Sequence, residues 1–220
     1  MARPSSDDVT AALLDRHGRT FAGELGIDVA SGEPSPLFRL LCASLLMSAR
    51  ISAGIAVTAA RALADAGWTT AEHMAASSWE ERARVLNEAG YARYDERTSA
   101  MLGETTELVL DRYGGDLRNL REEAEHDPSK ERRLIKECKG IGDVGADIFF
   151  REVQAAWPEL HPFADRRALS AAEQLGLGSD VGALAKLASD PGEFARLVAA
   201  LVRVELDDDH DGVLEAAGTS

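Results

Sequence analysis

The sequence contains little lysine and almost no cysteine. Only four of its 24 basic residues are lysines, and its two cysteines, Cys42 and Cys138, lie far apart in the chain. That spacing excludes a cysteine-based zinc or iron–sulfur site, and we expect no metal ligands elsewhere. Cys42 falls within the apolar segment LFRLLCASLLM. We therefore expect it to be a small buried hydrophobic residue rather than a reactive group.

The sequence also lacks a long apolar run and a basic leader. No apolar segment reaches the length needed to span a membrane, and the first residues carry Asp7, Asp8 and Asp15 where a targeting peptide would be basic. Aromatic residues make up only 5% of the chain, but apolar residues reach 45%, which is enough for a globular core. We expect a cytoplasmic protein with no membrane partner.

Positive charge is scarce overall. The chain has 38 acidic residues against 24 basic ones, giving a formal net charge of −14. A solvated acidic surface explains this balance, and a high-salt cytoplasm would screen its self-repulsion. A scarcity of lysine fits a GC-rich genome equally well. The acidic balance argues mildly against a polyanionic partner.

Helical periodicity dominates the chain, and no segment alternates as a strand would. Caps such as Ser78, first-turn carboxylates and terminal glycines punctuate the apolar repeats. The pattern predicts an all-α protein with roughly ten to twelve helices. The expected helices cover residues 9–16, 34–50, 52–66, 78–89, 95–113 and 128–139, and further ones begin near residues 143, 165, 179 and 190. The acidic, small-residue-rich segment 206–220 is expected to be a disordered tail.

The segment ECKGIGDVGADIF, residues 137–149, joins two of these helices through Gly140-Ile141-Gly142. One interpretation is a tight helix connector, in which Gly140 ends one helix. The other is a phosphate-binding hairpin, because the unpaired N–H groups at the start of the second helix favour an anion. Ile141 would then anchor the turn, Gly145 would allow close helix packing, and Lys139 would add a cation. The pattern alone leaves both interpretations open.

The segment LIKECKGIGDVGADIFF resembles the helix–hairpin–helix of the endonuclease III-like DNA glycosylase (HhH-GPD) superfamily. Members of that superfamily carry a catalytic aspartate at a later helix start, where this chain has Asp165, 25 residues after Gly140. Upstream, LFRLLCASLLMSARIS resembles the family segment that enters DNA, with Arg50 in place of the usual glutamine. GYARYDERTSAML resembles the family's glycine-led loop, in which Gly90 and Arg93 would face DNA and Tyr91 would be the intercalating wedge.

This resemblance implies a fold, a partner and a reaction. We expect a two-lobed all-α fold with a cleft between the lobes, one lobe covering residues 34–156 and the other combining residues 1–33 and 157–205. The implied partner is double-stranded DNA, bound by a monomer. The implied reaction is removal of a flipped damaged or mismatched base, with Asp165 stabilising the oxocarbenium-like sugar.

The chain also departs from the family pattern. Val144 occupies the position of the nucleophilic lysine of bifunctional members, so lysine-dependent lyase chemistry is not expected. Lys139 replaces the proline before the hairpin, and the four-cysteine iron–sulfur cluster is missing, although a monovalent cation at the hairpin stays open. The expectation is a monofunctional glycosylase. The alternatives are a non-catalytic helix–hairpin–helix DNA-binding module, an endonuclease-like homologue with drifted activity, or a helical scaffold that does not contact DNA.

Overall fold

The computed structural model describes residues 4–218, and these residues form helices and connecting turns without a strand. The described chain divides into two compact units. Unit 1 combines both chain ends, up to Glu24 and from Phe150, and unit 2 is the continuous segment Leu25–Phe149. The unit boundaries therefore lie seven to nine residues before those expected from the sequence. None of the helices in residues 4–218 is long and apolar enough to cross a membrane.

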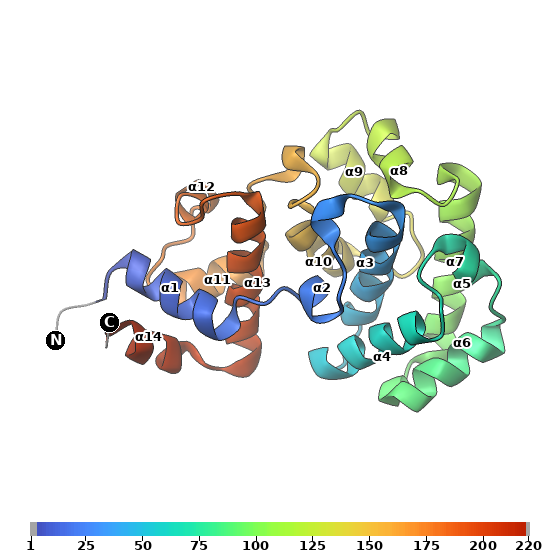
Figure 1. Ribbon diagram of the computed structural model, residues 1–220, viewed down its shortest axis with the longest axis horizontal. Coiled ribbons are helices and arrows are strands. Elements are labelled where there is room, and N and C mark those ends of the chain that lie inside the picture. Colours follow the sequence, from blue (N-terminus) through green and yellow to red (C-terminus); the bar gives the residue numbers. More distant parts are fainter. Residues whose placement is uncertain (1–3, 219–220) are drawn as a thin grey trace. The chain divides into compact units, whose positions relative to one another are not determined.

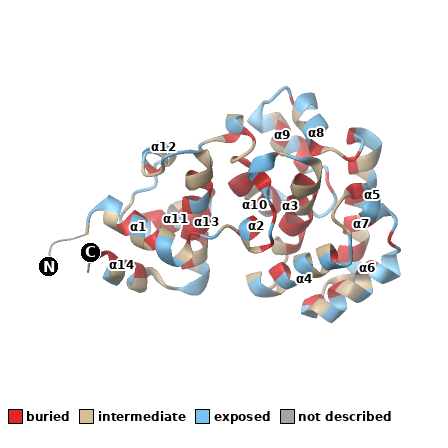
Figure 2. Ribbon diagram, in the orientation of Figure 1, coloured by how far each residue is buried: buried red, intermediate tan, exposed pale blue. Residues whose placement is uncertain are grey.

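Unit 2 is built around α3 (Pro34–Met47), which begins with prolines in its first turn and is buried over most of its length (Figure 2). A helix that is apolar nearly all round must be covered on every side, and α4, α7 and α8 pack against it (Figure 1). The remaining elements of unit 2 are η1 (Val29–Ser31), α4 (Ala53–Asp65), α5 (Ala71–Ala75), α6 (Trp79–Leu86), η2 (Asn87–Tyr91), α7 (Asp95–Tyr113), α8 (Leu117–Glu123), α9 (Pro128–Ile135) and most of α10 (Asp143–Val153).

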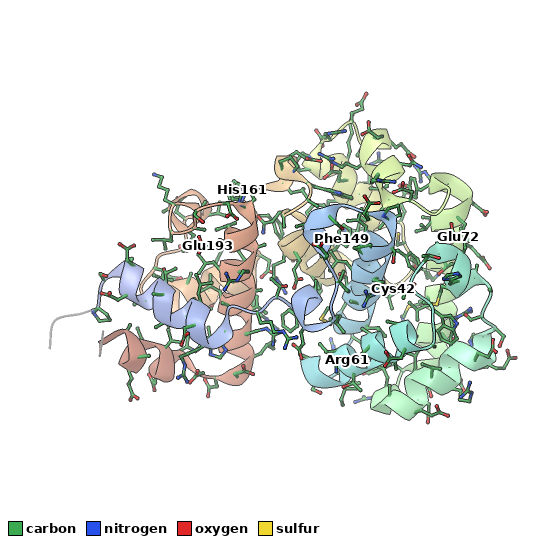
Figure 3. The ribbon with its side chains drawn as sticks, in the orientation of Figure 1. Cys42, Arg61, Glu72, Phe149, His161 and Glu193 are labelled. Atoms are coloured by element: carbon green, nitrogen blue, oxygen red, sulfur yellow. The ribbon has the colours of Figure 1, made fainter. Side chains whose placement is uncertain are left out.

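Both cysteines lie in the core of unit 2. Cys42 projects from α3 (Figure 3) and Cys138 follows α9, and both are buried and not disulfide-bonded. Burial raises the pKa of each thiol to about 12, because the thiolate would lose its hydration there. The expectation that Cys42 is a buried hydrophobic residue is confirmed.

Unit 1 is built around α13 (Pro191–Asp207), whose buried face is covered by α1 (Ser6–His17) and α11 (Arg166–Gln174). The polar face of α11 is exposed, whereas Ala168, Ala171 and Ala172 are buried, which is the spacing of an amphipathic helix. The other elements of unit 1 are α2 (Phe21–Glu24), η3 (Pro158–Leu160), α12 (Val181–Ala185), α14 (His210–Gly218) and the last residues of α10.

A buried carboxylate fixes the short helix α2 within unit 1. The two oxygens of Glu152 accept hydrogen bonds from the backbone N–H groups of Phe21 and Ala22, at 2.7 and 2.8 Å. These bonds satisfy two of the donors that any helix start leaves unpaired. Desolvation still raises the pKa of Glu152 above its ordinary value.

The C-terminal segment is helical, so the expectation of a disordered tail is wrong for residues 210–218; residues 219–220 lie outside the described residues. Helix α14 packs on α1 through Val213 and Ala217. At its start, Asp209 accepts a hydrogen bond from Arg16 at 2.7 Å, and His17 Nε2 lies 2.8 Å from the same oxygen. The acidic composition concealed these long-range partners, which come from the other end of the chain.

Candidate nucleic-acid interface

The hairpin between α9 and α10 has a fixed geometry. Gly140 adopts φ +86°, in the left-handed region that other residues avoid. A Cβ atom there would also lie 2.8 Å from the Met101 sulfur of α7. Ile141 is 4% exposed, and its N–H donates to the Cys138 carbonyl at 3.0 Å. The hairpin is therefore anchored by Ile141, as the sequence predicted.

Two further contacts hold the hairpin onto unit 2. The Thr105 hydroxyl of α7 donates to the Lys139 carbonyl at 2.9 Å. A Cβ atom on Gly145 would lie 3.2 Å from Ile141 Cδ1 and 3.6 Å from Ser48 Cβ. Gly145 thus lets α10 pack closely against the end of α3, which explains the glycine inside its first turn.

The start of α10 presents unpaired backbone donors. The N–H groups of Gly142, Asp143 and Val144 have no hydrogen-bond partner among residues 4–218, and all three residues are exposed. Val144 is 59% exposed, although it is apolar. Such donors carry the positive end of the helix dipole. They form a short surface suited to an anion, with no partner among residues 4–218.

The charges around the hairpin are largely paired. Asp143 lies 2.7 Å from Lys136 Nζ and 3.4 Å from Arg132 Nη2, and the lysine lowers the pKa of the aspartate. Lys139 Nζ lies 3.6 Å from Glu104, and both side chains are well exposed. The hairpin surface is therefore close to neutral on a strongly acidic protein. Its remaining attraction for an anion comes mainly from the backbone donors.

Tyr91 cannot be the wedge that the sequence predicted. Its side chain is 0% exposed, and its hydroxyl donates to the Leu46 carbonyl at 2.8 Å. Burial raises the pKa of this phenol to about 12. The wedge prediction is wrong because the aromatic ring is needed to fill the core beside the end of α3.

The other predicted residues of this loop and of the turn after α3 lie on the surface. Gly90 is exposed with φ +85°, and a Cβ atom there would meet open space. The Arg93 guanidinium lies over the Tyr94 ring, 5.4 Å from its centroid. Arg50 is exposed and makes no ion pair within the described part of the chain. The turn after α3 meets the hairpin through Ser48, and the loop meets the same helix end through Tyr91.

Asp165 belongs to unit 1, whereas the other predicted site residues belong to unit 2, and its carboxylate is fully engaged. One oxygen caps α11 by accepting the N–H groups of Arg167 and Ala168, at 2.8 and 3.1 Å. The other accepts Arg151 Nε at 2.7 Å and also Arg151 Nη2. Asp165 is 6% exposed. The Asp165 carboxylate is therefore not open to a bound sugar, which the role expected for it from the sequence would require.

The partners of Asp165 and of the segment before it were not predicted from the sequence. Arg151 lies on the last turn of α10 and Gln154 directly follows that helix, and both are buried within the largely apolar segment IFFREVQAAW. Gln154 accepts the Phe163 N–H and donates to the Phe163 carbonyl, each at 2.9 Å. Polar residues inside an apolar helical run were the available signal, because buried polar groups require partners. Within residues 4–218, no three His, Cys, Asp or Glu side chains are grouped to bind a metal ion.

Comparison with solved structures supplies the fold. A non-covalent endonuclease III–DNA complex aligns with a TM-score of 0.50 and 18% identity over 76% of this chain and 72% of the other. This chain has the endonuclease III-like helical fold. A trapped endonuclease III–DNA covalent intermediate, an estranged-adenine complex, aligns at 18% identity, with a TM-score of 0.49 over 76% and 73% of the two chains. No protein-family model matches the sequence, and no curated protein matches it. The all-α, helix–hairpin–helix fold expected from the sequence is confirmed.

Proposed function

We propose that this protein is a helix–hairpin–helix DNA-binding protein that holds duplex DNA through the hairpin of residues 139–145. The observation that carries the proposal is the run of exposed, unpaired N–H groups at Gly142, Asp143 and Val144. These donors suit a phosphate oxygen, because they combine hydrogen bonding with the helix dipole. The endonuclease III-like fold supports the proposal, since the non-covalent endonuclease III structure that shares it is a DNA complex.

Side chains near the hairpin would assist this contact only modestly. Lys139 is exposed and its distance from Glu104, 3.6 Å, is long for a strong pair, so it can turn to a phosphate. Arg50 has no ion pair within residues 4–218, so its side chain can also turn to a phosphate without breaking one. Asp143 opposes the contact because its negative charge sits among the donors. Affinity should therefore be weak and only moderately sensitive to salt.

Asp143 permits a sharp test, because it occupies the first position of α10, where proline is well tolerated. Asp143→Ala removes the opposing charge and keeps the N–H donor. Asp143→Pro removes both the charge and the donor. The two variants differ chiefly in one backbone hydrogen-bond donor, so comparing them isolates the role that the proposal gives to the backbone.

The measurement is fluorescence anisotropy of a short labelled duplex at low salt. We expect Asp143→Ala to bind several-fold more tightly than the native chain, since Lys136 is also released toward phosphate. Asp143→Pro should bind roughly tenfold more weakly than Asp143→Ala, the loss expected for one hydrogen bond to a charged group. If the two variants have equal helix content and bind DNA with equal affinity, the backbone N–H of residue 143 does not contact DNA as proposed.

A second candidate function is hydrolytic release of a base, without lysine-dependent lyase activity. The observation that favours it is the place of Asp165, a carboxylate at the start of α11 that is paired with Arg151. A charged carboxylate can stabilise an oxocarbenium-like sugar and accept a proton from water. One oxygen would have to leave Arg151 to do so. With Val144 at the lysine position, only water could attack the sugar.

Two matched variants separate this chemistry from folding. Asp165→Asn and Arg151→Gln break the same ion pair, but only the first removes the carboxylate. Base release from a panel of damaged duplexes should be lost in Asp165→Asn and persist in Arg151→Gln, at a temperature where both are folded. Release by neither variant nor the native chain would leave the protein a DNA-binding module.

A further inference from the structure

We propose that Arg166 and Arg167, on the exposed first turn of α11, form a second contact with the DNA backbone, on unit 1. This inference rests on the proposed DNA-binding function and extends it to a surface outside the hairpin. Both side chains are exposed, and neither has an ion pair or side-chain hydrogen bond within residues 4–218.

Among the described arginines of unit 1, only Arg166 and Arg167 lack a carboxylate or carbonyl partner, although acidic residues outnumber basic ones by 38 to 24 in the sequence. The other described arginines of unit 1 each donate to a carboxylate or a carbonyl; they are Arg16, Arg19, Arg151, Arg196 and Arg203. Carboxylates are therefore abundant and are used elsewhere in the same unit. The side chains of Arg166 and Arg167 are therefore available to bind another molecule.

Local sequence and geometry explain why no carboxylate reaches them. The only acidic residue between Leu160 and Ala172 is Asp165, which is buried and bound to Arg151. Positions three and four residues ahead of the arginines hold no acid, unlike the exposed Arg84–Glu88 pair. The exposed charge of this 13-residue stretch is thus purely positive.

The arginines do not serve the stability of α11. Cations in the first turn of a helix oppose its dipole, and two adjacent ones also repel each other. Their backbone does serve the helix, because the N–H of Arg167 binds Asp165. The side chains are therefore placed where they cost stability, which is expected of groups retained for a ligand rather than for folding.

The segment that presents the arginines is held firmly. The Gln154 side chain hydrogen-bonds both the N–H and the carbonyl of Phe163, and the Phe163 ring packs edge-on against Phe150 at a centroid distance of 5.7 Å. Arg151 holds Asp165, one residue before the pair. Arg151, Gln154 and Asp165 thus hold this segment in place before a ligand binds, which lowers the conformational-entropy cost of binding. Guanidinium groups match phosphate oxygens in geometry and charge, so the phosphodiester backbone of DNA is the partner that fits.

The experiment measures duplex affinity of the native chain, of Arg166→Ala/Arg167→Ala and of Lys186→Ala, by anisotropy from about 20 to about 200 mM salt. Lys186 is also an exposed, unpaired cation of unit 1, and it serves as the matched control. We expect the double variant to bind roughly ten- to fifty-fold more weakly at low salt and its logarithmic salt slope to fall by about two. Lys186→Ala should bind like the native chain, and thermal unfolding of the double variant should not begin earlier.

The outcomes separate this inference from the proposed function. If the native chain binds and Asp143→Pro weakens binding relative to Asp143→Ala, but the double arginine variant binds normally, only the second contact is overturned. Equal losses in the double variant and in Lys186→Ala would also overturn it, because they would indicate a general charge effect. A native chain that fails to bind duplex DNA would overturn both proposals. A matching loss of binding to polyglutamate would instead indicate an acidic protein partner.

Discussion

Asp165 and Arg151 form a buried pair in which each side chain satisfies the other. The aspartate also caps α11, so its loss would leave a buried guanidinium without a partner and a helix start without its cap. Such a pair contributes little net stability over an apolar pair, but breaking it on one side is costly. The sequence indicated the helix start correctly. It could not indicate the arginine, which lies 14 residues earlier and meets the aspartate only through folding.

We expect Asp165→Asn and Arg151→Gln each to lower the free energy of unfolding by roughly 3–5 kcal/mol. The exposed pair Arg84–Glu88 supplies the control, because Arg84→Ala should change it by less than about 0.5 kcal/mol. Urea unfolding followed by circular dichroism measures all three. A loss below about 1 kcal/mol for both core variants would show that the pair is hydrated in solution.

Cys42 and Cys138 give a second prediction at this scale. Because burial raises both thiol pKa values to about 12, neither should react with a thiol reagent at neutral pH while the protein is folded. Two thiols should react at once in denaturant. Rapid labelling of either cysteine in native protein would mean that unit 2 opens easily around α3.

The hairpin contains two glycines with different surroundings. Gly140 is required by its positive φ and by the nearness of Met101, whereas a Cβ atom on Gly142 would meet nothing within 4 Å. The two glycines look equivalent in the sequence Gly-Ile-Gly. The structure separates them: Gly140 makes the turn and Gly142 keeps the helix start open.

This difference predicts unequal effects of alanine. Gly140→Ala should lower the free energy of unfolding by about 1–2 kcal/mol or more, because the left-handed backbone and the methyl contact both oppose it. Gly142→Ala should change it by less than about 0.5 kcal/mol. Thermal or urea unfolding measures both, and equal losses would contradict the assigned roles.

The packing of α14 on α1 should weaken at low pH. Hydrogen bonds from Arg16 and then His17 lower the pKa of Asp209 below its ordinary value. A carboxyl group whose pKa is lowered by folding stabilises the fold above its unfolded pKa, and this contribution disappears as pH falls through the folded value. Limited proteolysis should therefore release the C-terminal segment more readily below about pH 4. Asp209→Asn should show the faster cleavage already at neutral pH, and an unchanged native-like rate would contradict this.

At the scale of the whole molecule, net charge and local binding have opposite salt dependences. With a net charge of −14, the folded chain repels itself, and salt screens that repulsion. DNA affinity would fall as the salt concentration rises, because the release of counterions from DNA on binding then contributes less free energy. The acidic balance is compatible with the proposed DNA-binding role, since the proposed contact would depend on local donors and a few arginines rather than on total charge.

We therefore expect the thermal midpoint of unfolding to rise between about 50 and about 500 mM salt, while duplex affinity falls over the same range. Scanning calorimetry and anisotropy on the same samples test this. A midpoint that falls with salt would indicate that the surface ion pairs outweigh the net repulsion.

The sequence by itself determined the all-α class, most helix positions and the anchored glycine hairpin, because these depend on local periodicity, caps and turn chemistry. It missed the short helices α2, α5 and α8, and it misjudged α14, Tyr91 and the surroundings of Asp165. Those features were decided by tertiary structure, through partners distant in sequence: Arg16 for Asp209, the Leu46 carbonyl for Tyr91, and Arg151 for Asp165. A residue's exposure and charge partners belong to the folded chain, whereas its helical tendency is already present in its neighbours.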